Sequence, residues 1–71
     1  MHLIINGQSQ NVQENLSLSE LISQLNMKPE RVAVERNGDI VPRNQWPQTA
    51  LQNGDRLEIV HFVGGGTFEL R

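Results

Sequence analysis

Residues 14–29, ENLSLSELISQLNMKP, contain the pattern that decides the fold. Ser17 precedes Glu20 by three residues, which is the spacing of a helix capping box, and Pro29 closes the segment. The apolar side chains fall at the i, i+3, i+4 and i+7 spacing of one helical face: Leu18, Leu21, Ile22 and Leu25. A lone helix in a small chain must bury such a face, so we interpret it as core.

Strand patterns lie on both sides of this helix. Before it, HLII at 2–5 and QSQNV at 8–12 are joined by Asn6-Gly7, a dipeptide typical of a tight hairpin. After it, RVAVE at 31–35 turns back at Asn37-Gly38. The stretch RLEIVHFV at 56–63 alternates apolar positions and predicts a final strand, entered by a turn at 53–55.

Residues 43–52 predict a loop. They follow Pro42, contain Pro47 and are otherwise mainly polar. Trp46 and Leu51 are the exceptions, and we interpret both as packing residues rather than as a binding surface.

The predicted order is strand, strand, helix, strand, strand, strand. A single helix covers one face of a mixed sheet of four to five strands, and the other face meets water. A right-handed crossover through the helix then places the last strand beside the first. This is the topology of the β-grasp, or ubiquitin-like, α+β fold, and we expect it over residues 1–63.

Composition excludes several classes of function. The chain has 71 residues, which suits one small domain, and no cysteine, which excludes disulfides and thiolate chemistry. Its net charge is −2 and its six basic residues are scattered, which argues against nucleic-acid binding. No apolar run approaches a membrane span, and the first residues lack a signal-peptide pattern, so we expect a cytoplasmic protein.

Reactive side chains do not converge in the sequence. The carboxylates are spread singly, and the motif of a phosphate loop is missing around the glycines. His2 and His61 would meet if the terminal strands were neighbours, but no further ligand accompanies them. We therefore expect no enzyme activity, no bound cofactor and no metal site, with His61 in or beside the core.

The water-facing side of the sheet carries more apolar residues than expected. Val60 and Phe62 lie opposite in parity to Leu57 and Ile59, and Ile4 lies opposite to its neighbours. If the first and last strands are adjacent, Ile4, Val60 and Phe62 form a cluster that suggests partner docking. Single exposed apolar residues or a strand bulge are the alternative explanation.

Three glycines follow the last predicted strand, at Gly64, Gly65 and Gly66. Glycine has no Cβ, so such a run is flexible and thin enough to thread a narrow channel. Extended, three residues span about 10 Å, which would carry a carboxylate from the domain into a partner's active site.

The stretches VERNGDIVPR (34–43) and EIVHFVGGG (58–66), with the turn at 53–55, resemble the ThiS family, small ubiquitin-like sulfur carriers of thiamine (thiazole) biosynthesis. The resemblance implies that Gly66 is the acceptor and that Gly64 and Gly65 lead into it. An E1-like adenylyltransferase would activate its carboxylate with ATP, and sulfur from a cysteine desulfurase would convert it to a thiocarboxylate. Thiazole synthase would then take the sulfur, so the protein would be a co-substrate.

Residues 67–71, TFELR, depart from this family pattern, because an internal glycine has no free carboxylate to activate. We expect them to be tag-derived or removed by a protease, with read-through into a longer polypeptide ranked last. Three other functions stay open: a molybdopterin-synthase small-subunit type of carrier, a ubiquitin-like protein modifier, and a plain β-grasp interaction module.

Overall fold

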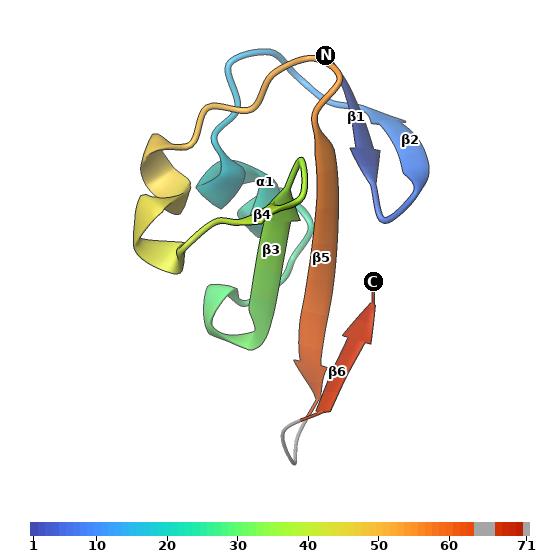
Figure 1. Ribbon diagram of the computed structural model, residues 1–71. Helices are drawn as coiled ribbons and strands as arrows, with labels where there is room; N and C mark the ends of the chain where they lie inside the picture. The colour runs from blue at the N-terminus through green and yellow to red at the C-terminus, as the bar shows by residue number, and fades with distance from the viewer. Residues whose placement is uncertain (64–66, 71) are drawn as a thin grey trace.

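The computed structural model describes residues 1–63 and 67–70, and Figure 1 shows how their elements are arranged. The strands are β1 (His2–Ile5), β2 (Gln8–Asn11), β3 (Val32–Arg36), β4 (Asp39–Ile40), β5 (Arg56–Val63) and β6 (Thr67–Leu70). The helices are α1 (Leu18–Gln24) and the 3₁₀ turns η1 (Pro29–Arg31) and η2 (Arg43–Gln48).

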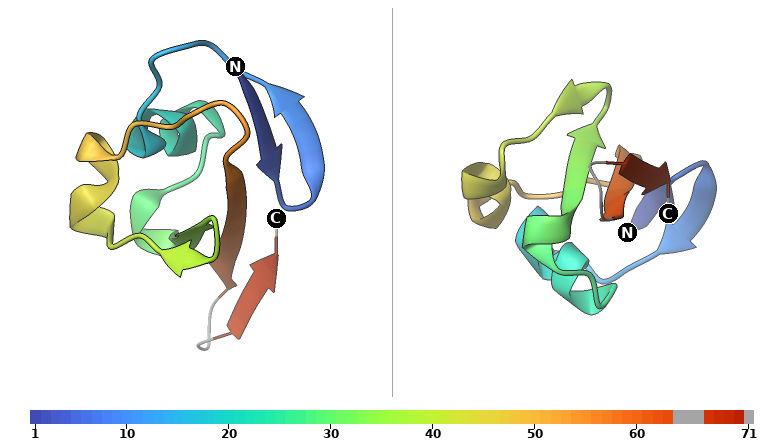
Figure 2. Two further views of the ribbon diagram at one scale, coloured as in Figure 1. Left: turned by 45° about the horizontal axis from the view of Figure 1, so that its top comes forward. Right: turned by 90° about the horizontal axis from the view of Figure 1, so that it is seen from below.

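The sheet is mixed, as predicted, and its order is β2-β1-β5-β3-β4. β1 and β5 are parallel neighbours, and every other described strand pair is antiparallel. The α-helix lies on one side of this sheet in both views of Figure 2. The β-grasp prediction is therefore confirmed, and β6, which pairs with β5, adds a strand that the sequence did not predict.

The helix α1 begins as the sequence predicts. The Ser17 hydroxyl accepts a hydrogen bond from the backbone N–H of Glu20 at 3.1 Å, and the Glu20 carboxylate accepts one from the N–H of Ser17 at 2.9 Å. The hydrogen bond from the Ser17 backbone N–H and the interaction with the Ser17 side chain lower the pKa of the Glu20 carboxyl below its ordinary value. No helix among the described residues has the length and apolar character needed to cross a bilayer.

The two Asn-Gly hairpins also form as predicted. Asn6 and Gly7 have φ of 50° and 80°, and Asn37 and Gly38 have φ of 53° and 91°. Positive φ at both central positions defines the turn whose twist matches that of the flanking strands, and asparagine and glycine are the residues that adopt it most readily. The sequence therefore sets the position of both reversals.

The core lies between α1 and the covered face of the sheet. It contains the helical stripe, alternate strand residues and the side chains that close the ends: Leu3, Ile5, Leu16, Leu18, Leu21, Ile22, Val32, Val34, Trp46, Leu51, Leu57 and Ile59. Leu25, which the helical spacing also places on this face, is partly buried against the cluster. Among the side chains whose burial the structure describes, those of residues 1–62, the fully buried apolar ones all precede residue 60.

The segment expected to be a loop is more ordered than predicted. Residues Arg43–Gln48 form η2, and the Trp46 indole, 2% exposed, donates its N–H to the carbonyl of Val41 at 2.9 Å. The loop prediction was wrong here because a short 3₁₀ turn tolerates Pro47, while burial of the indole holds the turn in place. The predicted packing role of Trp46 and Leu51 is confirmed.

Candidate docking face and exit strand

The strand that leads toward the glycines changes character along its length. In β5, Leu57 and Ile59 are fully buried, whereas Val60 and Phe62 are half-buried. β5 then continues to Val63. The expected acceptor Gly66, with Gly64 and Gly65, lies outside the described residues. The described part of the site is therefore the face and the edge of β5 that precede these glycines.

The edge of β5 that faces β1 forms hydrogen bonds first with the backbone of β1 and then with the side chain of Asn6. The N–H of Ile4 donates to the carbonyl of Asp55, and the N–H of Asn6 donates to the carbonyl of Leu57, both at 2.9 Å. The Asn6 side chain continues the ladder beyond the turn. Its amide oxygen accepts from the N–H of Ile59 at 2.7 Å, and its amide nitrogen donates to the carbonyl of Ile59 at 3.2 Å.

The role of Asn6 was missed by sequence reasoning, which assigned it to the turn alone. Its amide oxygen accepts from the Ile59 N–H and its NH₂ group donates to the Ile59 carbonyl, so it pairs with Ile59 as the backbone of another strand residue would. A signal was present in the sequence, because asparagine rather than aspartate precedes Gly7, and only the amide offers both groups. The partner 53 residues away could not be read from the sequence.

β6 continues the same edge. Its register places Thr67 opposite Val63, Phe68 opposite Phe62, Glu69 opposite His61 and Leu70 opposite Val60. Strand backbone groups alternate between the two edges, and Asp55, Leu57 and Ile59 all face β1. By this alternation, the backbone groups of His61 and Val63 also face that edge, where β6 lies.

The structure separates the three predicted docking residues. Ile4, Val60 and Phe62 are all half-buried and share the face away from α1, as their parity predicts. However, the β1–β5 register sets Ile4 opposite Arg56, four residues before Val60. Val60 and Phe62 are therefore neighbours on this face, whereas Ile4 lies apart from them. Phe62 also lines a hollow of about 230 Å³, together with Arg31, Ala33 and others.

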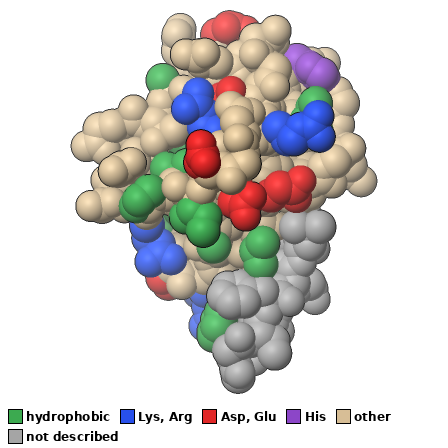
Figure 3. Space-filling model, viewed as in Figure 1, with side chains coloured by type: hydrophobic (Ala, Val, Ile, Leu, Met, Phe, Trp, Pro, Cys, Tyr) green, Lys and Arg blue, Asp and Glu red, His purple; other side chains and the backbone are tan. Residues whose placement is uncertain are grey.

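Two carboxylates lie at the centre of this open face. Glu35 on β3 and Glu58 on β5 are directly opposite one another in the register, and Ile40, 72% exposed, is opposite Glu35 on the other side. Figure 3 shows hydrophobic side chains in separate groups on this side of the molecule, with acidic side chains between them. The open face therefore carries two acidic side chains directly opposite one another on neighbouring strands.

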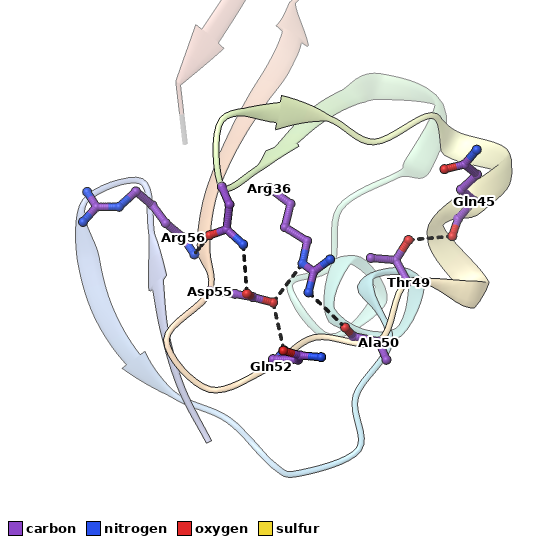
Figure 4. A network of polar contacts seen from close by, with 8 residues as sticks. Arg36, Gln45, Thr49, Ala50, Gln52, Asp55 and Arg56 are labelled. Carbon is purple, nitrogen blue, oxygen red and sulfur yellow. Dashed lines mark hydrogen bonds and ion pairs between the residues drawn. The ribbon is translucent and has the colours of Figure 1, made fainter.

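A buried carboxylate fixes the start of β5. Asp55, 6% exposed, accepts hydrogen bonds from the N–H of Gln52 at 2.8 Å, from the Arg36 guanidinium at 2.9 Å and from the Asn37 amide at 3.0 Å. The Asn37 oxygen in turn accepts from the N–H of Arg56 at 2.9 Å. Figure 4 shows these contacts converging on the turn into β5.

The ionisation of Asp55 follows from this environment. Burial raises the pKa of the Asp55 carboxyl, but the hydrogen bonds from Gln52, Asn37 and Arg36 and the charge of Arg36 act in the opposite direction and together outweigh it. The net result is a pKa below the ordinary value. The charged carboxylate therefore ties the β3–β4 turn to the start of the exit strand.

The histidines do not meet, contrary to one expectation from the sequence. The His2 ring contacts the Ser9 hydroxyl on β2, and the His2 carbonyl accepts from the N–H of Gly54 before β5 begins. His61 lies near the far end of β5, opposite Val32 on β3. Within residues 1–63 and 67–70, no three histidine, aspartate or glutamate side chains are grouped in a way that could hold a metal ion.

The order of the strands and the single helix over one face of the sheet place this protein in the ubiquitin-like β-grasp class. A sequence model of the ThiS family matches residues 3–66. The chain belongs to the ThiS family, and the resemblance that its motifs predicted is confirmed.

Individual relatives agree with this assignment. The chain is 32% identical to the sulfur carrier protein ThiS of Escherichia coli strain K12, over 93% of this chain and 100% of that protein. A crystal structure of thiamine biosynthesis protein ThiS from Geobacter metallireducens superposes with a TM-score of 0.81 at 38% identity, covering 93% of this chain and 100% of that one.

A second kind of relative is much longer. The chain is 43% identical to a thiazole synthase of Paramagnetospirillum magneticum over 94% of its own length, but it spans only 21% of that protein. A thiazole synthase of Magnetococcus marinus is matched in the same way, at 41% identity over 93% of this chain and 20% of that protein. In both relatives, a ThiS-like sequence is therefore one part of a longer protein named for another activity.

Proposed function

We propose that this protein is a sulfur carrier of thiamine biosynthesis whose Gly66 carboxylate is the carrying group. The observation that carries the proposal is the family match, which runs from residue 3 through Gly66 and includes the glycines after β5. The sulfur carrier protein ThiS of Escherichia coli matches over a comparable length, which supports the same role.

The proposed chemistry takes place at one carboxylate in two steps. An E1-like adenylyltransferase joins the Gly66 carboxylate to the AMP portion of ATP and releases pyrophosphate. In the second step, the outer sulfur of a persulfide that a cysteine desulfurase supplies attacks the acyl adenylate and displaces AMP, which gives an acyl disulfide. A thiol then attacks the inner sulfur of that disulfide, which forms a new disulfide and releases the thiocarboxylate. The carrier offers the carboxylate and a surface for docking, while the partners supply the catalytic groups, so the carrier is a co-substrate.

Thiazole synthase is the proposed acceptor of the sulfur. The two thiazole synthase relatives support this, because each contains a ThiS-like sequence within one polypeptide. Linking two modules raises the effective concentration of one at the other, which is useful when the two must meet in every cycle. Val60 and Phe62 form the proposed docking surface beside the exit strand, and Glu35 and Glu58 add negative charge to it.

The proposal is tested by charging a chain that ends at Gly66. Incubation with the E1-like enzyme, ATP and a sulfur source should raise the intact mass by the replacement of one oxygen atom with one sulfur atom. The same reaction without ATP is the matched control. The 71-residue chain should gain nothing, because its Gly66 carbonyl is an amide. An unchanged mass for the Gly66-terminated chain would refute the proposal.

A further inference from the structure

β6, which pairs with β5, follows the part of the chain that matches the family model. The family match ends at residue 66, whereas β6 covers Thr67–Leu70. β6 nevertheless takes up a defined antiparallel register against Val60–Val63. β1 and the Asn6 amide form hydrogen bonds with this edge of β5 as far as Ile59. β6 lies along the same edge beyond that residue.

We propose that the edge of β5 at His61 and Val63 is a strand-addition site. In this chain β6 fills the site, and once β6 is released an extended segment of a partner protein fills it instead. The identity of that partner as thiazole synthase rests on the function proposed above. The site itself rests on the pairing alone.

The need for a partner strand follows from how the edge is built. β1 cannot pair with His61 and Val63, because its chain reverses at Asn6-Gly7. The Asn6 amide extends the pairing as far as Ile59, because its oxygen and its nitrogen both bond the backbone of that residue. Unpaired backbone groups on a strand edge are a template for another strand, and main-chain hydrogen bonds supply affinity in such complexes.

Occupation by β6 is incompatible with presentation of the tail. While β6 is paired, Thr67 is held directly opposite Val63, so the chain returns along β5 instead of leading away from the domain. The proposed carrier function needs the chain to leave in the direction of β5. β6 and a partner strand therefore compete for one edge, and β6 acts as an internal inhibitor of docking.

The first experiment measures amide hydrogen exchange by NMR in the 71-residue chain and in a chain ending at Gly66. The shorter chain should fold, because it retains the whole of the described core cluster and because the Geobacter metallireducens structure corresponds to 93% of this chain. The amides of His61 and Val63 should exchange at least about fivefold faster without β6. The Ile59 amide, held by Asn6, is the internal reference. Equal exchange in the two chains would overturn the proposal.

Two proline variants of the full chain test which backbone N–H groups of β6 point toward β5. In E69P the lost N–H is the one that the register aims at β5, opposite His61, so exchange at His61 should accelerate. In L70P the lost N–H points away from β5, so exchange at His61 should change much less. Equal acceleration by both variants would contradict the assigned strand edge.

The second experiment adds thiazole synthase to each chain. The Gly66-terminated chain should bind at least about fivefold more tightly than the 71-residue chain, since only the fraction with β6 released is competent, and E69P should recover part of the loss. In the complex, the His61 and Val63 amides should again exchange slowly. Binding without that renewed protection would overturn the strand-addition site alone. No binding by the Gly66-terminated chain would overturn both this proposal and the acceptor assignment.

Discussion

The two halves of β5 show how one strand serves both the fold and the exit of the chain. From Arg56 to Ile59, the strand is paired with β1 and β3, and its inward side chains are fully buried. From Val60 to Val63, β1 no longer pairs with it, Val60 and Phe62 are half-buried, and β6 lies along its edge. Val60 and His61 remain paired with β3. We therefore expect the first half to contribute most to stability, and the open face of the second half and its edge along β6 to respond to partners.

The largest expected effect is on stability, at the buried half. Leu57→Ala should lower the free energy of unfolding by about 2–5 kcal/mol, because it removes a fully buried side chain and leaves a cavity. Val60→Ala, three residues further along, should cost less than about 1 kcal/mol, since Val60 is already half in water. Urea denaturation of both variants checks the contrast, and equal losses would contradict the division of β5.

Substitutions in the second half of β5 should change the affinity for partner proteins rather than the stability of the fold. Phe62→Asp should weaken binding to the E1-like enzyme by about 2 kcal/mol or more, as loss of an aromatic anchor does at many interfaces. Gln24→Asp, on an exposed position of α1, adds the same charge on the covered side of the sheet and should leave binding unchanged. Titration calorimetry measures both, with circular dichroism as the fold control. If F62D unfolds, Phe62 belongs to the core and the docking assignment is wrong.

The junction between the halves is tested at Asn6. Asn6→Gly keeps a residue that adopts φ of 50° readily but removes both hydrogen bonds to Ile59. We expect a loss of about 1–2 kcal/mol in the free energy of unfolding and faster exchange of the Ile59 amide. Asn26→Gly, at a similar φ of 58° on an exposed position, is the matched control. A loss no larger than that of N26G would refute the strand-like role of Asn6.

The smallest effect is the pH dependence at the start of β5. The folded pKa of Asp55 is lowered, so its contribution to stability is complete above the unfolded value of about 3.9 and disappears as the pH falls through the folded pKa. Asp55→Asn should therefore show a smaller fall in unfolding free energy between pH 6 and acid pH than the parent chain. Urea titrations across that range measure the difference, and parallel curves would show that Asp55 does not carry it.

The sequence predicted the features that depend on neighbouring residues. Ser17 and Glu20 form their capping box because the two partners are three residues apart, and the Asn-Gly turns form because their φ values are local preferences. The burial of Leu57 and Ile59 follows from alternation within one strand. The same reasoning gave the β-grasp order, since few connections join these elements without crossing.

The features that the sequence did not reveal depend on distant partners. The alternation of side chains along β1 predicted the correct face of the sheet for Ile4. The register between the parallel strands β1 and β5, however, places Ile4 opposite Arg56 rather than near Val60. The convergence of Arg36, Asn37 and Gln52 on Asp55 needs the folded chain, as does the amide of Asn6 on Ile59. β6 was not predicted, because residues 67–71 were interpreted by their departure from the family pattern.

The parallel pairing of β1 and β5 also bears on how the domain resists force. The N-terminus lies at one end of this strand pair and β5 leaves at the other, as Figure 1 shows. A partner that pulls on the exit strand while the first strand is held therefore loads the connecting hydrogen bonds in shear, all together, instead of opening them one at a time. If the proposed insertion of the tail into a partner enzyme pulls on β5, this geometry would help the body of the domain to stay folded.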